Sequence, residues 1–266
     1  GFPAELRYCG GLGTCGSMKT LVLLLFLFGI VSGGEIKTDG TSFIFRAPQK
    51  VSSNSRIMIL FGGRNWTGEK TLNTYHFDEL ADKHSLFLLS PSFRDRSYWE
   101  PEAWSGEALL KAIAELEKLY QLTPQKIYLY GYSAGGQCAT LFANWLPERV
   151  SAWGAHACGV YPETIHTKAP ALLTCGREDS ARFQLSQLFL YRYRENGGTL
   201  LWKPLASGHD LSKDALDLAY AWFDALLSGV SSMQYGEDDT FQIGKRIDEE
   251  FRNPLYSDTI RKLWQK

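Results

Sequence analysis

One serine stands in surroundings typical of a nucleophile. Ser133 occupies the centre of Gly131-Tyr-Ser-Ala-Gly135, which has the pattern G-x-S-x-G. The apolar run Ile127–Tyr130 precedes this segment and a helix-forming segment follows it, so the serine is expected on a tight strand-to-helix turn. Side chains at the two glycine positions would collide in such a turn, which lifts the serine hydroxyl clear of the sheet. The pattern therefore predicts nucleophilic attack on a carbonyl carbon.

A serine hydroxyl is a weak nucleophile unless a base accepts its proton. Among the five histidines, His209 is the best placed, because it lies in the loop between the last predicted strand and the last predicted helix. This loop falls at the same edge of the sheet as Ser133. His156, which follows an earlier strand, is instead expected to line the site.

A carboxylate must hold the histidine ring in the correct tautomer. Asp179 comes directly after the predicted strand Ala171–Cys175 and is the expected acid. Glu178 is the neighbouring alternative, and Glu163 would serve if the acid followed the preceding strand. The order serine, acid, histidine is the chain order of hydrolases built around this kind of turn.

Backbone N–H groups must also stabilise the negative charge that develops on the attacked carbonyl oxygen. One donor is expected at Ala134, the residue after the nucleophile. The second is expected from the loop Phe61-Gly-Gly-Arg64, at Gly63 or next at Gly62, because glycines let the backbone approach a substrate closely. An ordinary tight turn is the alternative for this loop.

Alternating strands and helices position these residues. Apolar runs predict buried strands, and segments of helical period between them predict the crossovers of a mainly parallel sheet. The α/β class follows, with helices flanking a central sheet. The strands are predicted at Ile57–Phe61, Leu86–Ser90, Ile127–Tyr130, Ala152–Ala155, Ala171–Cys175 and Thr199–Lys203, with an extended edge piece at Phe43–Arg46. The helices are predicted at Leu72–Lys83, Gly106–Tyr120, Ala134–Trp145, Arg182–Glu195 and Lys213–Leu227.

The ends of the chain differ from this pattern. Met18-Lys19, the apolar run Leu21–Val31 and the small residues after it predict a signal peptide over 18–33, with an upstream extension at 1–17. The apolar run is shorter than the roughly 20 residues that span a bilayer, although a membrane anchor or a buried helix is the alternative. We therefore expect a secreted or periplasmic protein without stable membrane insertion. Residues 34–229 form the predicted catalytic domain, and 230–266 a tail that wraps it or is disordered.

Charge and cysteine content exclude other classes. The formal net charge of −1 provides no basic field for nucleic acid. Outside the predicted leader the chain keeps Cys138, Cys158 and Cys175, whose spacing does not suit zinc. Cys158 and Cys175 end neighbouring predicted strands, so a disulfide between them and free buried thiols both stay open.

These motifs resemble those of the α/β-hydrolase superfamily, and within it secreted esterases similar to polyhydroxybutyrate depolymerases and feruloyl esterases. The resemblance covers roughly Arg56 to Leu227. It rests on Phe61-Gly-Gly63, Tyr130-Gly-Tyr-Ser-Ala-Gly-Gly136, Gly176-Arg-Glu-Asp179 and Gly208-His209, and the tail residues Gly236–Thr240 with Arg252-Asn253 look like an extension of bacterial members. It implies the α/β-hydrolase fold and ester hydrolysis through an acyl-enzyme, with no metal or organic cofactor. Relatives usually carry His-Gly where this chain has Phe61-Gly62.

The substrate is predicted from loop lengths and aromatic residues. The connection from Ala155 to Ala171 is short for a lid or cap domain, so an open site is expected, which suits a bulky aromatic ester or a polymer surface better than a buried lipid chain. Trp66, Trp99, Trp104 and Tyr132 are candidates for an aromatic wall, with a core position as the alternative for each tryptophan. A serine peptidase of the prolyl-oligopeptidase type and an inactive binding module are the other function classes. The sequence carries no signal for a particular oligomeric state.

Overall fold

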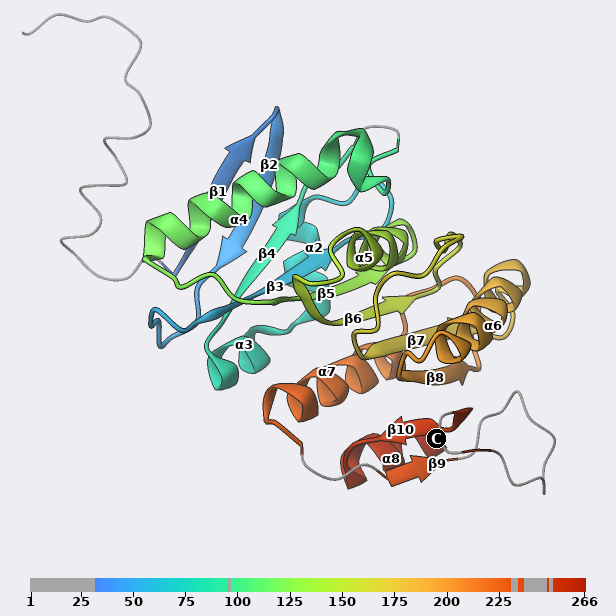
Figure 1. The fold of residues 1–266 in the computed structure, drawn as a ribbon. Coiled ribbons are helices and arrows are strands. Elements are labelled where there is room, and N and C mark those ends of the chain that lie inside the picture. The colour runs from blue at the N-terminus through green and yellow to red at the C-terminus, as the bar shows by residue number, and fades with distance from the viewer. Residues whose placement is uncertain (1–31, 95–96, 231–233, 237–247, 249–250) are drawn as a thin grey trace, which may run out of the picture. The chain divides into compact units, whose positions relative to one another are not determined.

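A central sheet of eight strands carries the fold in the computed structural model, which describes residues 32–266 apart from 95–96, 231–233, 237–247 and 249–250 (Figure 1). The strand order is β1-β2-β4-β3-β5-β6-β7-β8. Strands β3 to β8 are parallel, and β1 and β2 are antiparallel additions at one side. The strands are β1 (Gly33–Thr38), β2 (Thr41–Arg46), β3 (Arg56–Phe61), β4 (Leu86–Pro91), β5 (Ile127–Tyr132), β6 (Val150–His156), β7 (Ala171–Gly176) and β8 (Leu200–Leu205).

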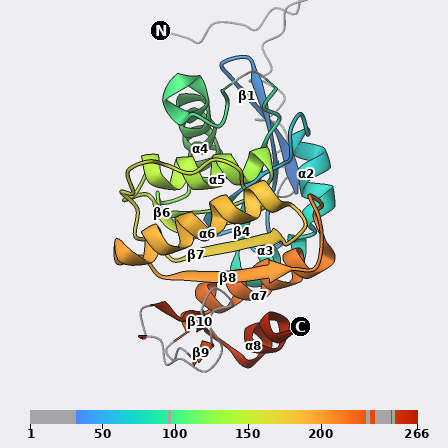
Figure 2. The same cartoon turned by 90° about the vertical axis from the view of Figure 1, so that its right-hand side faces the viewer.

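Helices cover both faces of this sheet, as the two views show (Figures 1 and 2). The apolar side chains of α4 (Gly106–Tyr120), α5 (Ala134–Trp145) and α6 (Ser180–Glu195) pack on one face. Those of α2 (Gly68–Tyr75), α3 (Asp78–His84) and α7 (Lys213–Leu227) pack on the other. Because both faces are covered, the parallel strands are apolar almost throughout. The predicted α/β class with a mainly parallel sheet is confirmed.

The region predicted as one helix over Leu72–Lys83 contains two. His76 adopts a left-handed backbone conformation with φ of 53°, and its N–H bonds the Leu72 carbonyl oxygen, which ends α2. Phe77 then turns into the core, where it is 1% exposed, and α3 begins at Asp78. Burial of the Phe77 ring therefore outweighs the helical period of the sequence.

The edge position predicted for Phe43–Arg46 is also wrong. Strand β1 pairs outside β2 as a hairpin, through the two-residue turn Asp39-Gly40. Both turn residues have positive φ, at 49° and 76°, as a hairpin turn that matches strand twist requires. The first residue of β1, Gly33, is the last residue of the predicted signal peptide, whose other described residue is Ser32. Residues 1–31, with the rest of that segment and the upstream extension, lie outside the described residues.

The described part of the predicted C-terminal tail packs on the last strand of the sheet. It forms β9 (Gln234–Gly236), β10 (Asn253–Leu255) and α8 (Asp258–Gln265). The Trp202 N–H of β8 donates to the Asn253 side-chain oxygen at 2.6 Å, and the Trp202 carbonyl accepts the Trp264 indole N–H at 2.8 Å. The outward-facing polar groups of Trp202 are thus paired by side chains of the tail.

Two further features concern the predicted disulfide and the apolarity of the helices. Cys138, Cys158 and Cys175 are free, buried thiols, so the structure contains no Cys158–Cys175 disulfide. Within the described residues, no helix combines the length and apolarity that crossing a membrane demands.

The apolar core lies between the sheet and its flanking helices.

Candidate active site

The predicted nucleophile sits on a strained turn between β5 and α5. Ser133 has φ of 57° and ψ of −118°, a conformation that a residue with a side chain rarely adopts. Its N–H donates to the His156 carbonyl at 2.9 Å, and its carbonyl accepts the Gln137 N–H at 3.1 Å. A β-carbon on Gly131 would lie 2.0 Å from the Gly135 carbonyl oxygen, so the turn excludes any side chain there.

Two hydrogen bonds join the three predicted catalytic side chains. Ser133 Oγ lies 2.9 Å from His209 Nε2, and His209 Nδ1 lies 2.7 Å from Asp179 Oδ2. Because a carboxylate only accepts, Nδ1 carries the proton and Nε2 faces the serine hydroxyl as an acceptor. This arrangement can take the serine proton during attack.

The carboxylate of Asp179 is held on both oxygens. Its side chain is 7% exposed, and Arg182 Nη1 donates to the second oxygen, Oδ1, at 3.0 Å. Arg182 lies one turn into α6, the helix that begins directly after Asp179. Sequence reasoning missed this contact, although the spacing of three residues on a helix is a signal for it.

The two alternative acids lie elsewhere. Glu178 is exposed, and its backbone N–H bonds the Ser207 carbonyl of the histidine loop. Glu163 is also exposed, in the loop between β6 and β7. A β-carbon on Gly176 would lie 2.2 Å from the Ser207 carbonyl oxygen, so the end of β7 touches the histidine loop through backbone alone. The structure therefore brings Asp179 to His209, and neither glutamate.

The predicted oxyanion residues lie where the end of β3 meets the start of α5. Ala134 begins α5, and Ser133 makes no capping bond to that helix. The Phe61 carbonyl before Gly62 and Gly63 accepts the Tyr75 hydroxyl at 2.6 Å, which fixes the loop at its base. The Phe61 ring is buried, and its centroid lies 5.2 Å from that of the Phe142 ring.

The four residues predicted to form an aromatic wall do not all lie together. Trp66 and Tyr132 lie together, with ring centroids 5.9 Å apart, and both would contact a β-carbon on Gly63. Trp99 packs on Tyr98 at 5.2 Å, and Trp104 packs on Phe93 at 5.3 Å. Of the four predicted wall residues, Trp66 and Tyr132 lie beside the proposed oxyanion loop.

His156 does not line the site as expected. Its side chain is completely buried, with Nδ1 2.8 Å from Thr174 Oγ1 and Nε2 2.7 Å from the Asp210 carbonyl oxygen. Burial lowers the pKa of His156. The residue is correctly assigned to the neighbourhood of the site but wrongly to a surface that a substrate could touch.

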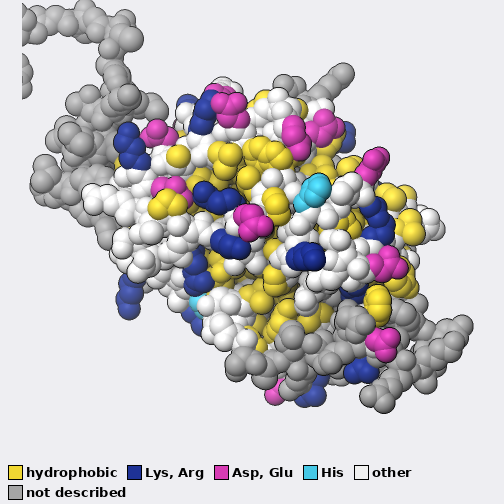
Figure 3. Space-filling model, viewed as in Figure 1, with side chains coloured by type: hydrophobic (Ala, Val, Ile, Leu, Met, Phe, Trp, Pro, Cys, Tyr) yellow, Lys and Arg dark blue, Asp and Glu magenta, His cyan; other side chains and the backbone are white. Residues whose placement is uncertain are grey.

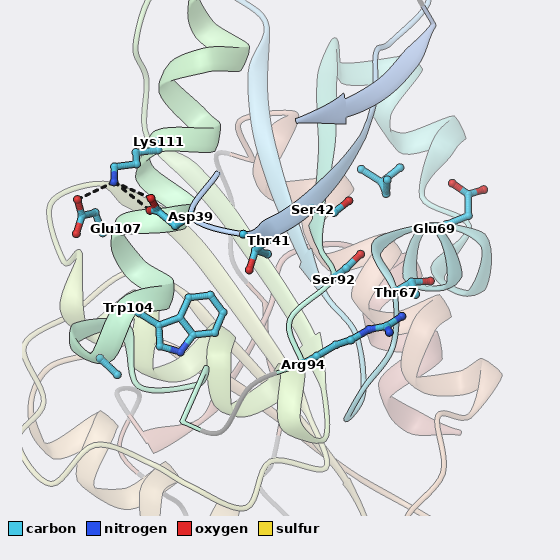
Figure 4. A pocket seen from close by; sticks show the side chains of 13 residues that line it. Asp39, Thr41, Ser42, Thr67, Glu69, Ser92, Arg94, Trp104, Glu107 and Lys111 are labelled. Carbon is cyan, nitrogen blue, oxygen red and sulfur yellow. Dashed lines mark hydrogen bonds and ion pairs between the residues drawn. The ribbon is translucent and has the colours of Figure 1, made fainter. Parts of the chain in front are cut away.

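A cavity of about 920 Å³ lies beside the start of α2 (Figure 4). Lys111 bridges Asp39 and Glu107 on one wall, at 3.0 Å and 2.9 Å. Thr67, the residue after Trp66, lies on another wall, and Arg94 extends from the loop after β4. Trp104 also lines this cavity, which is thus polar and of mixed charge.

Among the described residues, no group of three or more histidine, cysteine, aspartate or glutamate side chains is arranged to hold a metal ion.

Comparisons with known proteins identify the fold. No protein-family model matches the chain, and no curated protein matches its sequence. A thermostable esterase superposes with a TM-score of 0.56 at 17% identity, over 66% of this chain and 54% of the esterase, so the chain spans about half of that protein. Poly(aspartic acid) hydrolase-1 from Sphingomonas sp. KT-1 gives 0.58 at 16% identity, over 74% and 98%. LpqC, a poly(3-hydroxybutyrate) depolymerase from Bordetella parapertussis, gives 0.57 at 15% identity, over 78% and 96%. With its parallel sheet, flanking helices and serine turn after β5, the chain has the α/β-hydrolase fold.

Proposed function

We propose that this protein is a serine hydrolase that cleaves carboxylic esters. The observation that carries the proposal is the hydrogen-bonded chain from Ser133 Oγ through His209 to Asp179, at 2.9 Å and 2.7 Å. The named esterases and depolymerase among its structural neighbours support the same reaction class.

In the proposed reaction, Ser133 Oγ attacks the ester carbonyl carbon as its proton passes to His209 Nε2. The N–H groups of Ala134 and Gly63 bind the oxyanion that forms. Collapse of this intermediate breaks the bond to the alcohol, which leaves with the proton from His209. Water then attacks the acyl-enzyme and gives a proton to His209. His209 passes this proton to Ser133 Oγ as the bond from Oγ to the acyl carbon breaks, which releases the carboxylic acid and restores the serine hydroxyl.

Aromatic esters of the feruloyl type or polyesters are the proposed substrates. Trp66 and Tyr132 offer aromatic surface beside the oxyanion loop, and residues 157–170 between β6 and β7 contain no helix or strand that could cover it. Among the described residues, the exposed large apolar side chains are Val160, Leu185 and Leu188, and Figure 3 shows apolar surface on the side where α6 lies. Such surface suits contact with an apolar polymer.

Export to the periplasm or the exterior is also proposed. It rests on the sequence of residues 18–33 alone, with its basic residue, short apolar run and small residues. Fractionation of cells that express the full chain, with and without residues 18–33, tests this proposal.

Labelling with a fluorophosphonate probe tests the reaction class. The wild-type protein is expected to react at one serine and to hydrolyse p-nitrophenyl acetate, whereas Ser133→Ala should do neither while keeping its circular dichroism spectrum. Loss of a triad serine typically costs on the order of 10⁶ in turnover. Activity of the Ser133→Ala variant within about tenfold of wild type would contradict the proposed function.

A panel of substrates distinguishes the proposed esterase from a peptidase. Hydroxycinnamate esters and polyester films should be cleaved, and long-chain triglycerides poorly, since a long acyl chain needs a covered apolar tunnel. Cleavage of peptide anilides in preference to esters would instead indicate a peptidase.

A further inference from the structure

Two consecutive carbonyl groups of the histidine loop are held by side chains from other elements. The Tyr132 hydroxyl donates to the His209 carbonyl at 3.1 Å, and His156 Nε2 lies 2.7 Å from the Asp210 carbonyl oxygen. Tyr132 ends β5 and His156 ends β6, so the central strands fix the backbone on which the proposed base stands.

His156 also contacts the nucleophile. Its backbone carbonyl accepts the Ser133 N–H at 2.9 Å, while its ring bonds the loop that carries His209. One buried residue therefore joins the backbone of Ser133 to that of Asp210, the residue that follows His209.

The hydrogen-bond partners of the His156 ring determine which ring nitrogen carries the proton. A carbonyl oxygen can only accept, so Nε2 carries hydrogen and donates to Asp210. Nδ1 then accepts the Thr174 hydroxyl proton at 2.8 Å in the neutral ring. The ring is fully buried, and burial lowers the pKa of His156, which favours this neutral form.

The ring also packs against the serine turn. Tyr132 stacks on His156 with centroids 5.6 Å apart and on His209 at 5.5 Å. A shift of the His156 ring would therefore disturb both the loop backbone and the tyrosine that contacts the proposed base.

We propose that His156 is a positioning residue, whose Nε2–H bond to the Asp210 carbonyl sets the distance between His209 and Ser133. The proposal rests on the proposed function, since it concerns the same reaction. It assigns His156 no contact with substrate.

Two substitutions separate positioning from packing. His156→Phe keeps an aromatic ring but has no donor, whereas the side-chain amide of His156→Gln can still donate to the Asp210 carbonyl. Neither change removes the backbone bond to Ser133. We expect His156→Phe to lower kcat for p-nitrophenyl acetate by about 10- to 100-fold, the scale of a small misplacement of reacting groups, with KM within about threefold. His156→Gln should recover most of kcat.

The outcomes distinguish the two proposals. A folded His156→Phe protein with kcat within about twofold of wild type, or equal losses in the Phe and Gln variants, would overturn positioning. If the Phe variant does not fold, His156→Leu takes its place, because it also removes the donor to the Asp210 carbonyl; a folded Leu variant with kcat within about twofold of wild type overturns the proposal. An inactive, unlabelled wild-type protein would overturn the proposed function instead. In that case the His209 ring resonances still test positioning, since they should shift in the Phe variant and stay in the Gln variant.

Discussion

A β-carbon added to Gly135 would lie 2.1 Å from the Phe61 carbonyl oxygen. The start of α5 therefore touches the end of β3 through backbone atoms alone. The same β-carbon would lie 2.5 Å from the Gly62 carbonyl oxygen, so no side chain fits between the serine turn and the proposed oxyanion loop.

Gly135→Ala should consequently disable the site. The added methyl group must displace the loop that carries Gly62 and Gly63, and we expect kcat to fall by about 100-fold or more. Gly208→Ala is the matched control, because a β-carbon there meets nothing within 4 Å. Steady-state kinetics on both variants check this, and equal effects would contradict the steric explanation.

Asp179→Asn should lower kcat by roughly 10⁴, as loss of the carboxylate that holds the histidine tautomer does in other triads. Glu178→Gln, at the adjacent exposed position, should leave kcat within about threefold. Measurement of kcat for p-nitrophenyl acetate decides between them. The reverse order of effects would make Glu178 the acid.

Trp66→Ala should raise KM for a hydroxycinnamate ester more than for an acetate ester. An aromatic pair contributes about 0.5–1.5 kcal/mol beyond buried area, which corresponds to a change of about 2- to 12-fold. Trp99→Ala, whose ring packs on Tyr98, is the control and should affect both substrates alike. Equal effects of Trp66→Ala on the two esters would leave substrate choice unexplained.

Much of the fold follows from local sequence patterns. The predicted helices Gly106–Tyr120, Ala134–Trp145 and Lys213–Leu227 match α4, α5 and α7, because strong apolar periodicity and tertiary packing agree there. The hairpin of β1 and β2 was missed despite the Asp39-Gly40 turn signal, since the strand begins within the predicted signal peptide.

The position of a site residue can be predicted where a short sequence motif determines it. It cannot be predicted where it depends on contacts between elements that are far apart in the chain. The serine turn and the histidine loop follow from short segments. The role of His156 does not, because its partners Thr174 and Asp210 are brought to it only by the packing of neighbouring strands and a loop. The Arg182 contact lies between these cases, since helical spacing suggests it but the direction of the side chain depends on the fold.

Asn253→Ala should destabilise the protein without changing kcat. The Asn253 side chain is fully buried, and its oxygen accepts the Trp202 N–H and an Arg194 N–H at 3.2 Å. Removal of a buried acceptor costs about 1–3 kcal/mol. Thermal unfolding should show Tm lower by several degrees, at about 2–4 °C per kcal/mol for a domain of this size. An unchanged Tm would mean that the tail does not contribute to stability.

The pairing of Trp202 by Asn253 and Trp264 also bears on how the chain folds. An open edge strand is a template for pairing with another chain. Since the residues that cover β8 follow it by about fifty positions in the chain, this edge stays open during synthesis until the tail emerges. Self-association is therefore most expected in nascent or truncated chains, whereas in the folded protein Asn253 and Trp264 cover this edge.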